Sequence, residues 1–140
     1  MTQEDKKLLL KDLCARLPYG VIVSVTDGTI KYEAYIESIS YKYIQVSPVS
    51  GSVFTPYTFY KISEIKPYLR PMSSMTEEEK IEYLDIDNGS YSCPMDYAHI
   101  PASERIDWFN AHHFDYRGLI EKGLAIAVTP ENNPYIKNKS

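Results

Sequence analysis

Five side chains in the second half of the chain are of the types that bind zinc: Cys93, His99, His112, His113 and Asp115. Thiolate and imidazole are the ligands that zinc prefers. None of them has the tight paired spacing of a zinc site, and adjacent helical positions point about 100° apart, so only one of the two neighbouring histidines could face a shared ion. We therefore expect no metal and no cofactor, with one histidine packed beside Trp108 or Phe109 and the other solvated.

An acidic segment of the sequence partly matches a calcium-binding loop. Asp85-Ile86-Asp87-Asn88-Gly89 is followed by Asp96, eleven residues after Asp85. The glycine stands fifth instead of sixth, and the twelfth residue is Asp where Glu would bind through both oxygens. We interpret this segment as the end of a helix closed by Asn-Gly, and not as a calcium site.

Signatures of covalent and phosphoryl chemistry are missing from the sequence. The six glycines are scattered and form neither a phosphate-binding loop nor a Gly-x-Ser-x-Gly turn. Cys93 precedes Pro94, with no helix N-terminus there to activate its thiol. We therefore expect a protein that is not an enzyme. A hydrolase site built from His112, His113 and Asp115 is an alternative if imidazole and carboxylate converge in a pocket.

The segment from Asp107 to Leu124 is the richest in groups that form interfaces. Seven such residues lie within ten consecutive positions: Trp108, Phe109, His112, His113, Phe114, Tyr116 and Arg117. Tryptophan, tyrosine and arginine dominate interface energies when they sit in desolvated pockets. We expect the three residues Trp108, Phe109 and Phe114 to anchor this segment on the rest of the protein. Arg117, with His112 or His113, is expected to face a partner or a groove; if it is buried, Asp115 or Asp107 would pair with it.

Tyrosines are the second feature that suggests binding. Thirteen occur in the chain, and seven lie between residues 19 and 60. Tyr35 falls on the polar face of a predicted strand, and Tyr41 and Tyr43 share one face of another. Exposed tyrosines suit the recognition of proteins or of stacked bases, although tyrosine is also a good strand former. With Lys42 and Lys61, these three tyrosines form an alternative nucleic-acid-binding surface.

The charge distribution opposes that alternative on average. The formal net charge is -4 and the pI is near 5.4, whereas nucleic-acid binding needs clustered positive charge. The acidic residues are unevenly spread, because residues 76–107 hold nine acids against Lys80 and Arg105. The rest of the chain is consequently slightly basic.

The first half of the sequence predicts one helix followed by short strands. Thr2 and Asp5 form a capping-box pattern, Leu9 to Leu17 recur at three- and four-residue spacing, and Pro18 ends the helix. In this helix Cys14 is expected to be a small buried hydrophobe. Strands with a period of two follow around Asp27-Gly28, a strong hairpin signal, with Val23 facing the core and Ile22 the opposite side.

Further strands and turns are predicted up to residue 71. The alternation slips near Ser38, which indicates a bulge. Residues 41–46 and 53–61 read as a third and a fourth strand, residues 62–65 as a single helical turn, and residues 66–71 as extended chain.

The second half predicts helices. Thr76 with Glu79 forms a capping box, with Ser74 and Glu77 as a competing register. Residues 88–101 are expected to be irregular. Ser103 is predicted to cap the helix that carries Trp108, and Asp115 a short last helix through Leu119 and Ile120. Residues 124–128 read as a closing strand, and residues 132–140 as a frayed tail.

Together these patterns predict an α+β fold. It consists of an N-terminal helix, a small curled antiparallel sheet or partly open barrel of Src-homology-like or Sm-like type, and a helical C-terminal half. The expected divisions are residues 1–71 for the helix and barrel, 72–130 for a helical extension packed on the barrel, and 131–140 for a disordered tail. No stretch is apolar enough for a secretory signal or a membrane span, so we expect a cytoplasmic protein that makes no membrane contact.

Two blocks of the sequence resemble a known family. Residues 65–79, Ile65-Lys66-Pro67-Tyr68-Leu69-Arg70-Pro71 through Glu79, and residues 107–126, from Asp107-Trp108-Phe109 to Ile126, are similar to uncharacterised small proteins encoded on prophages and other mobile elements of gut bacteria. The resemblance implies a phage or mobile-element origin and a cytoplasmic setting, and assigns no catalytic residue. We expect a protein-binding accessory or regulatory module whose partner is a host or phage protein.

Overall fold

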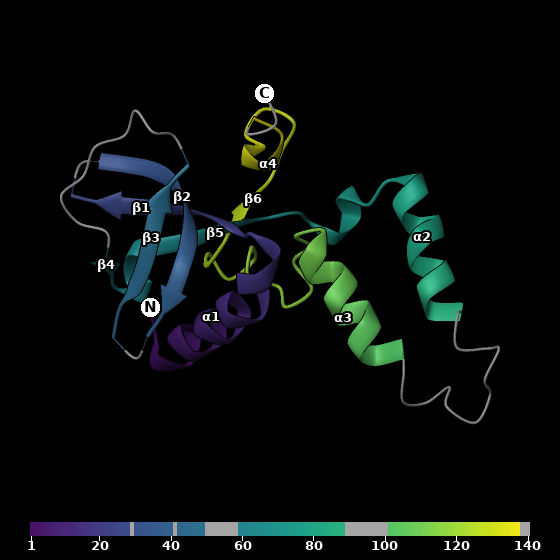
Figure 1. The fold of residues 1–140 in the computed structure, drawn as a ribbon, viewed down its shortest axis with the longest axis horizontal. Helices are drawn as coiled ribbons and strands as arrows, with labels where there is room; N and C mark the ends of the chain where they lie inside the picture. The colour runs from purple at the N-terminus through teal and green to yellow at the C-terminus, as the bar shows by residue number, and fades with distance from the viewer. Residues whose placement is uncertain (29, 41, 50–58, 89–100, 138–140) are drawn as a thin grey trace.

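In the computed structural model the described residues are 1–28, 30–40, 42–49, 59–88 and 101–137. They form the predicted α+β fold, in which a helix crosses one face of a curled six-stranded sheet and further helices follow (Figure 1). The sheet has the order β4-β3-β2-β1-β5-β6. Its strands are β1 (Ile22–Asp27), β2 (Ile30–Ile39), β3 (Ile44–Pro48), β4 (Phe59–Tyr60), β5 (Ile65–Leu69) and β6 (Ile126–Ala127). Neighbouring strands are antiparallel except β5 and β6, which are parallel.

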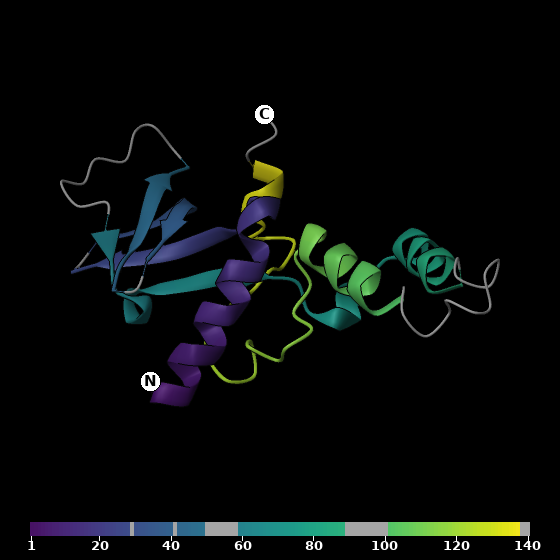
Figure 2. The ribbon, with the colours of Figure 1, turned by 60° about the horizontal axis from the view of Figure 1, so that its bottom comes forward.

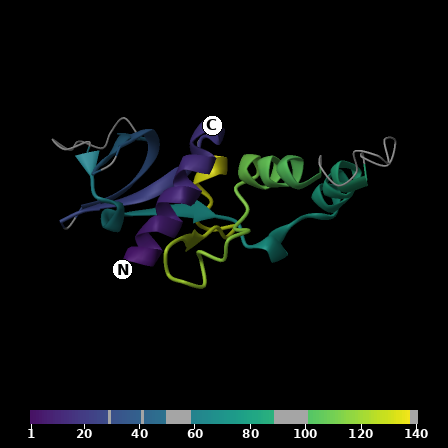
Figure 3. The same ribbon diagram turned by 90° about the horizontal axis from the view of Figure 1, so that it is seen from below.

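Helix α1 (Gln3–Arg16) covers the inner face of the sheet, as Figures 2 and 3 show. Its capping box is confirmed, because Thr2 Oγ1 accepts the Asp5 amide at 3.0 Å and Asp5 accepts the Thr2 amide. The buried stripe consists of Leu9, Asp12, Leu13 and Arg16. The prediction that Cys14 is buried is wrong: two charged residues occupy the inward positions, and Cys14 is rotated away from them to an exposed face.

The β1–β2 hairpin forms where Asp27-Gly28 predicted it, but the turn begins one residue later than expected, because Asp27 still pairs with Ile30 as the last residue of β1. Gly28 adopts a φ of 63°, a conformation that glycine reaches without a steric penalty. On β2 the inward residues Tyr32, Ala34 and Ile36 are buried, and the register shifts between Ile36 and Ser38, where the bulge was expected. The alternation therefore places one face of this strand in the core.

Strand β1 differs from the prediction because both of its faces are covered. Ile22 is 1% exposed and Val23 is fully buried. Ile22 lies opposite Tyr35 of β2, and its amide donates to the hydroxyl of Tyr135, so the C-terminal segment approaches the outer face at this point. The expectation that Ile22 faces solvent is wrong.

Aspartate substitutions in β1 test this arrangement. Val23→Asp and Ile22→Asp are both expected to destabilise the protein by several kcal/mol, because each buries a charge that has no partner. Thr26→Asp, at an exposed position of the same strand, is the matched control and should change the free energy of unfolding by roughly 0.5 kcal/mol or less. Chemical denaturation measures all three. If Ile22→Asp behaved like Thr26→Asp, the C-terminal segment would not cover β1.

The remaining strands are shorter than predicted. The third begins at Ile44 instead of residue 41, and the fourth is described only as Phe59–Tyr60, since most of its expected span lies outside the described residues. The helical turn at residues 62–65 is confirmed as a 3₁₀ turn, Ile62–Glu64. The segment after this turn, predicted as extended chain, forms β5. This strand lies inside the sheet and pairs with β1 as far as Pro67.

Helices α2 (Glu77–Asn88) and α3 (Pro101–Ala111) extend away from the sheet (Figure 1). The Thr76 capping box is confirmed by two hydrogen bonds with Glu79, at 2.9 and 3.1 Å. The predicted Ser103 cap is wrong, because α3 already begins at Pro101. The expected irregular segment at residues 88–101 lies largely outside the described residues.

Residues 112–125 form successive turns where a short helix was predicted. Gly118 has a φ of 75°, which interrupts helical geometry between Asp115 and Ile120. Asp115 nevertheless accepts two backbone amides, those of Leu119 and Ile120. The C-terminal half is therefore only partly helical.

The last described segment is part of the fold. Residues 134–137 form α4 (Pro134–Lys137), so the predicted frayed tail is wrong for this segment. The Tyr135 hydroxyl accepts the Ile22 amide at 3.1 Å and donates to the Tyr68 carbonyl at 2.7 Å. One side chain thus bridges β1 and β5 where their backbone pairing ends.

Candidate binding cleft

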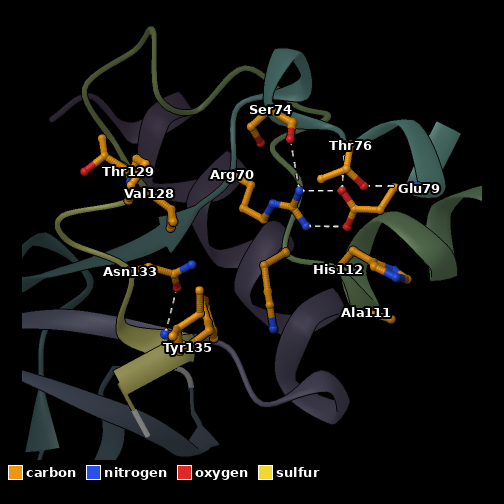
Figure 4. Close-up of a pocket in the computed structure, with 13 residues that line it drawn as sticks. Arg70, Ser74, Thr76, Glu79, Ala111, His112, Val128, Thr129, Asn133 and Tyr135 are labelled. Atoms are coloured by element: carbon orange, nitrogen blue, oxygen red, sulfur yellow. Dashed lines mark hydrogen bonds and ion pairs between the residues drawn. The ribbon is translucent and has the colours of Figure 1, made fainter. Parts of the chain in front are cut away.

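The described structure contains an open cleft of about 740 Å³, formed by the C-terminal segment together with the end of β5, the start of α2 and the end of α3 (Figure 4). The end of β5 and the start of α2 form one wall, the end of α3 forms another, and residues 128–136 form the third. Its lining residues are Arg70, Ser74, Thr76, Glu79, Ala111, His112, His113, Val128, Thr129, Pro130, Asn133, Tyr135 and Ile136.

Arg70 joins the walls of the cleft. Its backbone bonds to the carbonyl of His113 and to the amide of Asp115, at 2.7 and 2.9 Å. Its guanidinium binds both oxygens of Glu79 at 2.6 Å (Figure 4). It also lies 4.2 Å from the centre of the Phe114 ring. The Arg70 hydrogen bonds hold the pKa of Glu79 at about 2, well below the ordinary value. The positive charge of Arg70 is therefore already neutralised by Glu79 within the protein.

The two predicted histidines have different surroundings. The imidazole of His112 stacks on Trp108 at 4.2 Å, and its Nδ1 donates to the Trp108 carbonyl at 3.0 Å. Glu82 approaches His112 Nε2 only to 3.9 Å, beyond hydrogen-bond distance. The expectation that a histidine packs beside Trp108 is confirmed for His112. The expectation that the other histidine is solvated is wrong, because the ring of His113 stacks on Tyr135 and its Nδ1 is buried.

His113 closes helix α3 in the left-handed conformation. Its φ is 64°, and the bonds from the His113 amide to the Asn110 carbonyl and from the Phe114 amide to the Phe109 carbonyl form a Schellman motif. Glycine is the usual residue at this position. The imidazole stacks on Tyr135 at 3.8 Å, and its Nδ1 is buried with no partner in the described structure. Burial, and secondarily the charge of Arg16, lowers the pKa of His113 to about 4.

Arg117 lies at a buried ion-pair network. Its Nε binds Asp12 Oδ1 at 3.1 Å, while Arg16 Nε binds the other Asp12 oxygen at 2.7 Å. Asp12 and Arg16 are fully buried, whereas the Arg117 side chain is 20% exposed. The carboxylate partner expected from the sequence, Asp115 or Asp107, is wrong, because Asp12 of α1 takes that role.

An aromatic cluster joins α2 and α3 to the rest of the protein. Trp108 stacks on Phe114 at 5.7 Å, and Phe109 contacts Tyr83 of α2 at 5.2 Å and Tyr116 at 5.7 Å. The Trp108 indole donates to Glu82 at 2.9 Å. The expected anchoring role of Trp108, Phe109 and Phe114 is confirmed.

The structure does not bring the predicted tyrosines together. Tyr35 is 38% exposed and lies on β2 opposite Ile22 of β1. Tyr43 is 45% exposed and lies beside the N-terminal half of α1. Tyr41 lies outside the described residues. The predicted tyrosine surface is therefore divided between two sites.

The described residues do not form the catalytic or metal sites weighed from the sequence. Both oxygens of Asp115 accept hydrogen bonds from backbone amides. This carboxylate is therefore not available as the partner of either histidine in a hydrolase site. Within the described part of the chain, no three histidine, cysteine, aspartate or glutamate side chains gather closely enough to hold a metal ion; Cys93 and His99 lie outside it. No helix among the described residues is long and apolar enough to cross a bilayer.

Four residues of these sites were missed by the sequence interpretation: Asp12, Arg16, Arg70 and Tyr135. Only the first two carry a local signal, since an aspartate and an arginine four residues apart interrupt the apolar stripe of α1. Comparison of the chain with protein-family models, with curated proteins and with solved structures finds no match.

Proposed function

We propose that the protein is a non-enzymatic module that binds a host or phage protein in the C-terminal cleft. The observation that supports this proposal is a set of apolar side chains at the edge of the cleft, next to a polar side chain that an ion pair holds in place. Ile136 is 63% exposed and lines the cleft together with Val128 and Pro130, while Arg70 is held by Glu79. Large exposed aliphatic side chains next to a concave surface are typical of protein-binding sites.

The charges around the cleft favour a basic partner segment. Exposed Glu77 and Glu78 adjoin the lining residues of α2, and exposed Glu131 follows Pro130. Arg70 is neutralised by Glu79, and Glu77 pairs with Lys80 at 3.2 Å, so Glu78 and Glu131 give the rim of the cleft its negative charge. A partner that inserts an apolar side chain flanked by lysine or arginine would complement both features. The resemblance to mobile-element proteins supports a search for this partner in cells that carry such elements.

Affinity capture with the full chain tests the proposal. An extract of gut bacteria carrying the mobile element is passed over the immobilised wild type, an Ile136→Asp variant and an Ile81→Asp control. Ile81 is 62% exposed on α2 and does not line the cleft. We expect one discrete protein to be retained by the wild type and the control, and at least about tenfold less by Ile136→Asp, because the contact would desolvate a charge. Equal retention by all three forms, or no retained protein, would contradict the proposal.

A further inference from the structure

Two adjoining hollows at the opposite end of the sheet form a continuous basic groove, which we call the lysine groove. Each has a volume of about 270 Å³, and they share Lys6, Lys42, Tyr43 and Ile62. The N-terminal half of α1, the turn between β2 and β3, and the turn before β5 contribute its walls. The lining residues are Gln3, Lys6, Lys7, Leu10, Ser40, Lys42, Tyr43, Ile44, Lys61, Ile62 and Ser63.

Four exposed lysines give this groove its charge. Lys6 and Lys7 come from α1, and Lys42 and Lys61 come from the two turns; among the residues that the structure describes, no acidic one lines either hollow. Within the described residues, none of the four forms an ion pair. The neighbouring carboxylates of Asp5 and Glu64 accept backbone amides, those of Thr2 and Lys61, instead of pairing with a lysine ammonium. Four like charges in one groove fit an anionic ligand with several charges.

The groove also holds a flat aromatic surface. Tyr43 is 45% exposed, and its backbone is fixed by Ser40, whose amide and hydroxyl both donate to the Tyr43 carbonyl, at 3.0 and 2.8 Å. An exposed ring between lysines, carried on a backbone held by these bonds, can stack on a base while the ammonium groups contact phosphates. Bases within a duplex are already stacked, so this combination favours a single strand.

We propose that the lysine groove binds the phosphate backbone of single-stranded nucleic acid, with Tyr43 stacking on a base. The acidic average of the chain does not oppose this, because nine of the nineteen acids lie in residues 76–107, which leaves thirteen basic and ten acidic residues elsewhere. The groove is separate from the C-terminal cleft, so this site does not depend on the protein partner proposed for the cleft.

Fluorescence anisotropy with labelled twelve-nucleotide oligothymidine and oligouridine measures this binding in the full chain. Each phosphate contacted in a single strand contributes about −0.7 to the slope of log affinity against log salt. Four lysine contacts therefore give a slope near roughly −2.8, and an affinity that falls about 50-fold between 50 and 200 mM salt. Lys42→Ala is expected to reduce the slope to about −2.1, and Lys42→Glu with Lys61→Glu to abolish binding.

Tyr43→Ala separates stacking from charge. It should weaken binding about 5- to 150-fold while leaving the salt slope unchanged, because it removes a ring and no charge. Tyr35→Ala and Lys66→Ala, at exposed positions of the sheet outside the groove, are the matched controls and should bind like the wild type. Circular dichroism verifies that each variant is folded.

Three outcomes would overturn the proposal. The first is the absence of wild-type binding at 50 mM salt. The second is binding that Lys42→Glu with Lys61→Glu leaves intact. The third is equal affinity for a duplex or for polyglutamate together with no effect of Tyr43→Ala, which would make the groove a site for acidic proteins. Ile136→Asp should bind the oligonucleotides normally, so failure at the cleft and failure at the groove are distinguishable.

Discussion

Replacing Asp12 by alanine is expected to lower the free energy of unfolding by about 3–5 kcal/mol, a large part of the total stability of a small domain. The carboxylate is fully buried between Arg16 and Arg117, with N–O distances of 2.7 and 3.1 Å. Arg16 is also fully buried, and although one of its nitrogens donates to the Phe114 carbonyl at 2.6 Å, its Nη1 has no partner in the described structure. Without Asp12, a buried guanidinium would lose its counter-charge.

Arg117→Ala is the matched comparison for this prediction. Its side chain is 20% exposed, and its removal leaves Asp12 and Arg16 as a balanced pair. We expect a folded variant that loses about 1 kcal/mol. Urea denaturation at pH 7 measures both variants. Equal losses for Asp12→Ala and Arg117→Ala would show that the network does not depend on Asp12 in this way, and an unfolded Arg117→Ala would remove Arg117 from the partner-binding residues.

Local signals predicted several elements of the fold well because local forces determine them. The capping boxes at Thr2 and Thr76 and the Asp27-Gly28 turn each depend on residues within four positions of one another. The bulge after Ile36 was visible as a slip in the alternation. The prediction failed at Ile22, where the C-terminal segment reaches β1: the Ile22 amide donates to the hydroxyl of Tyr135, which lies 113 positions away in the sequence.

The candidate sites were less predictable because they depend on such distant contacts. Arg117 has a local carboxylate two positions away, Asp115, yet that group caps a turn and Arg117 instead pairs with Asp12, 105 positions away. Lys6 and Lys61 come together only because α1 lies against the turn before β5. Charge spacing along the chain could not indicate either arrangement, whereas the aromatic density of residues 108–116 did indicate an anchoring cluster.

His113 is expected to make the protein less stable as the pH falls from 6.5 to 4. The imidazole is buried against Tyr135, and Arg16, His112 and Arg70 all oppose its protonation. Its pKa is about 4 in the folded protein and near 6.5 in the unfolded chain, so the unfolded chain binds the proton first. The stabilisation that His113 provides is therefore complete above pH 6.5 and is lost as the pH falls towards 4. A shift of this size corresponds to about 3 kcal/mol.

A His113→Asn variant isolates this effect, because asparagine tolerates the left-handed backbone at φ 64° and does not titrate. Urea denaturation across pH 7 to 4 should show a free energy of unfolding that declines by about 3 kcal/mol more in the wild type than in the variant. His112→Gln serves as the control for the neighbouring imidazole and should retain the steep decline. At pH 7 we expect His113→Asn to be the less stable protein, because it loses the stacking on Tyr135, and at pH 4 this difference should vanish or reverse. An NMR titration of His113 with a pKa near 6.5, or parallel pH profiles for the wild type and His113→Asn, would show that the imidazole is accessible to water and that α4 does not pack over it.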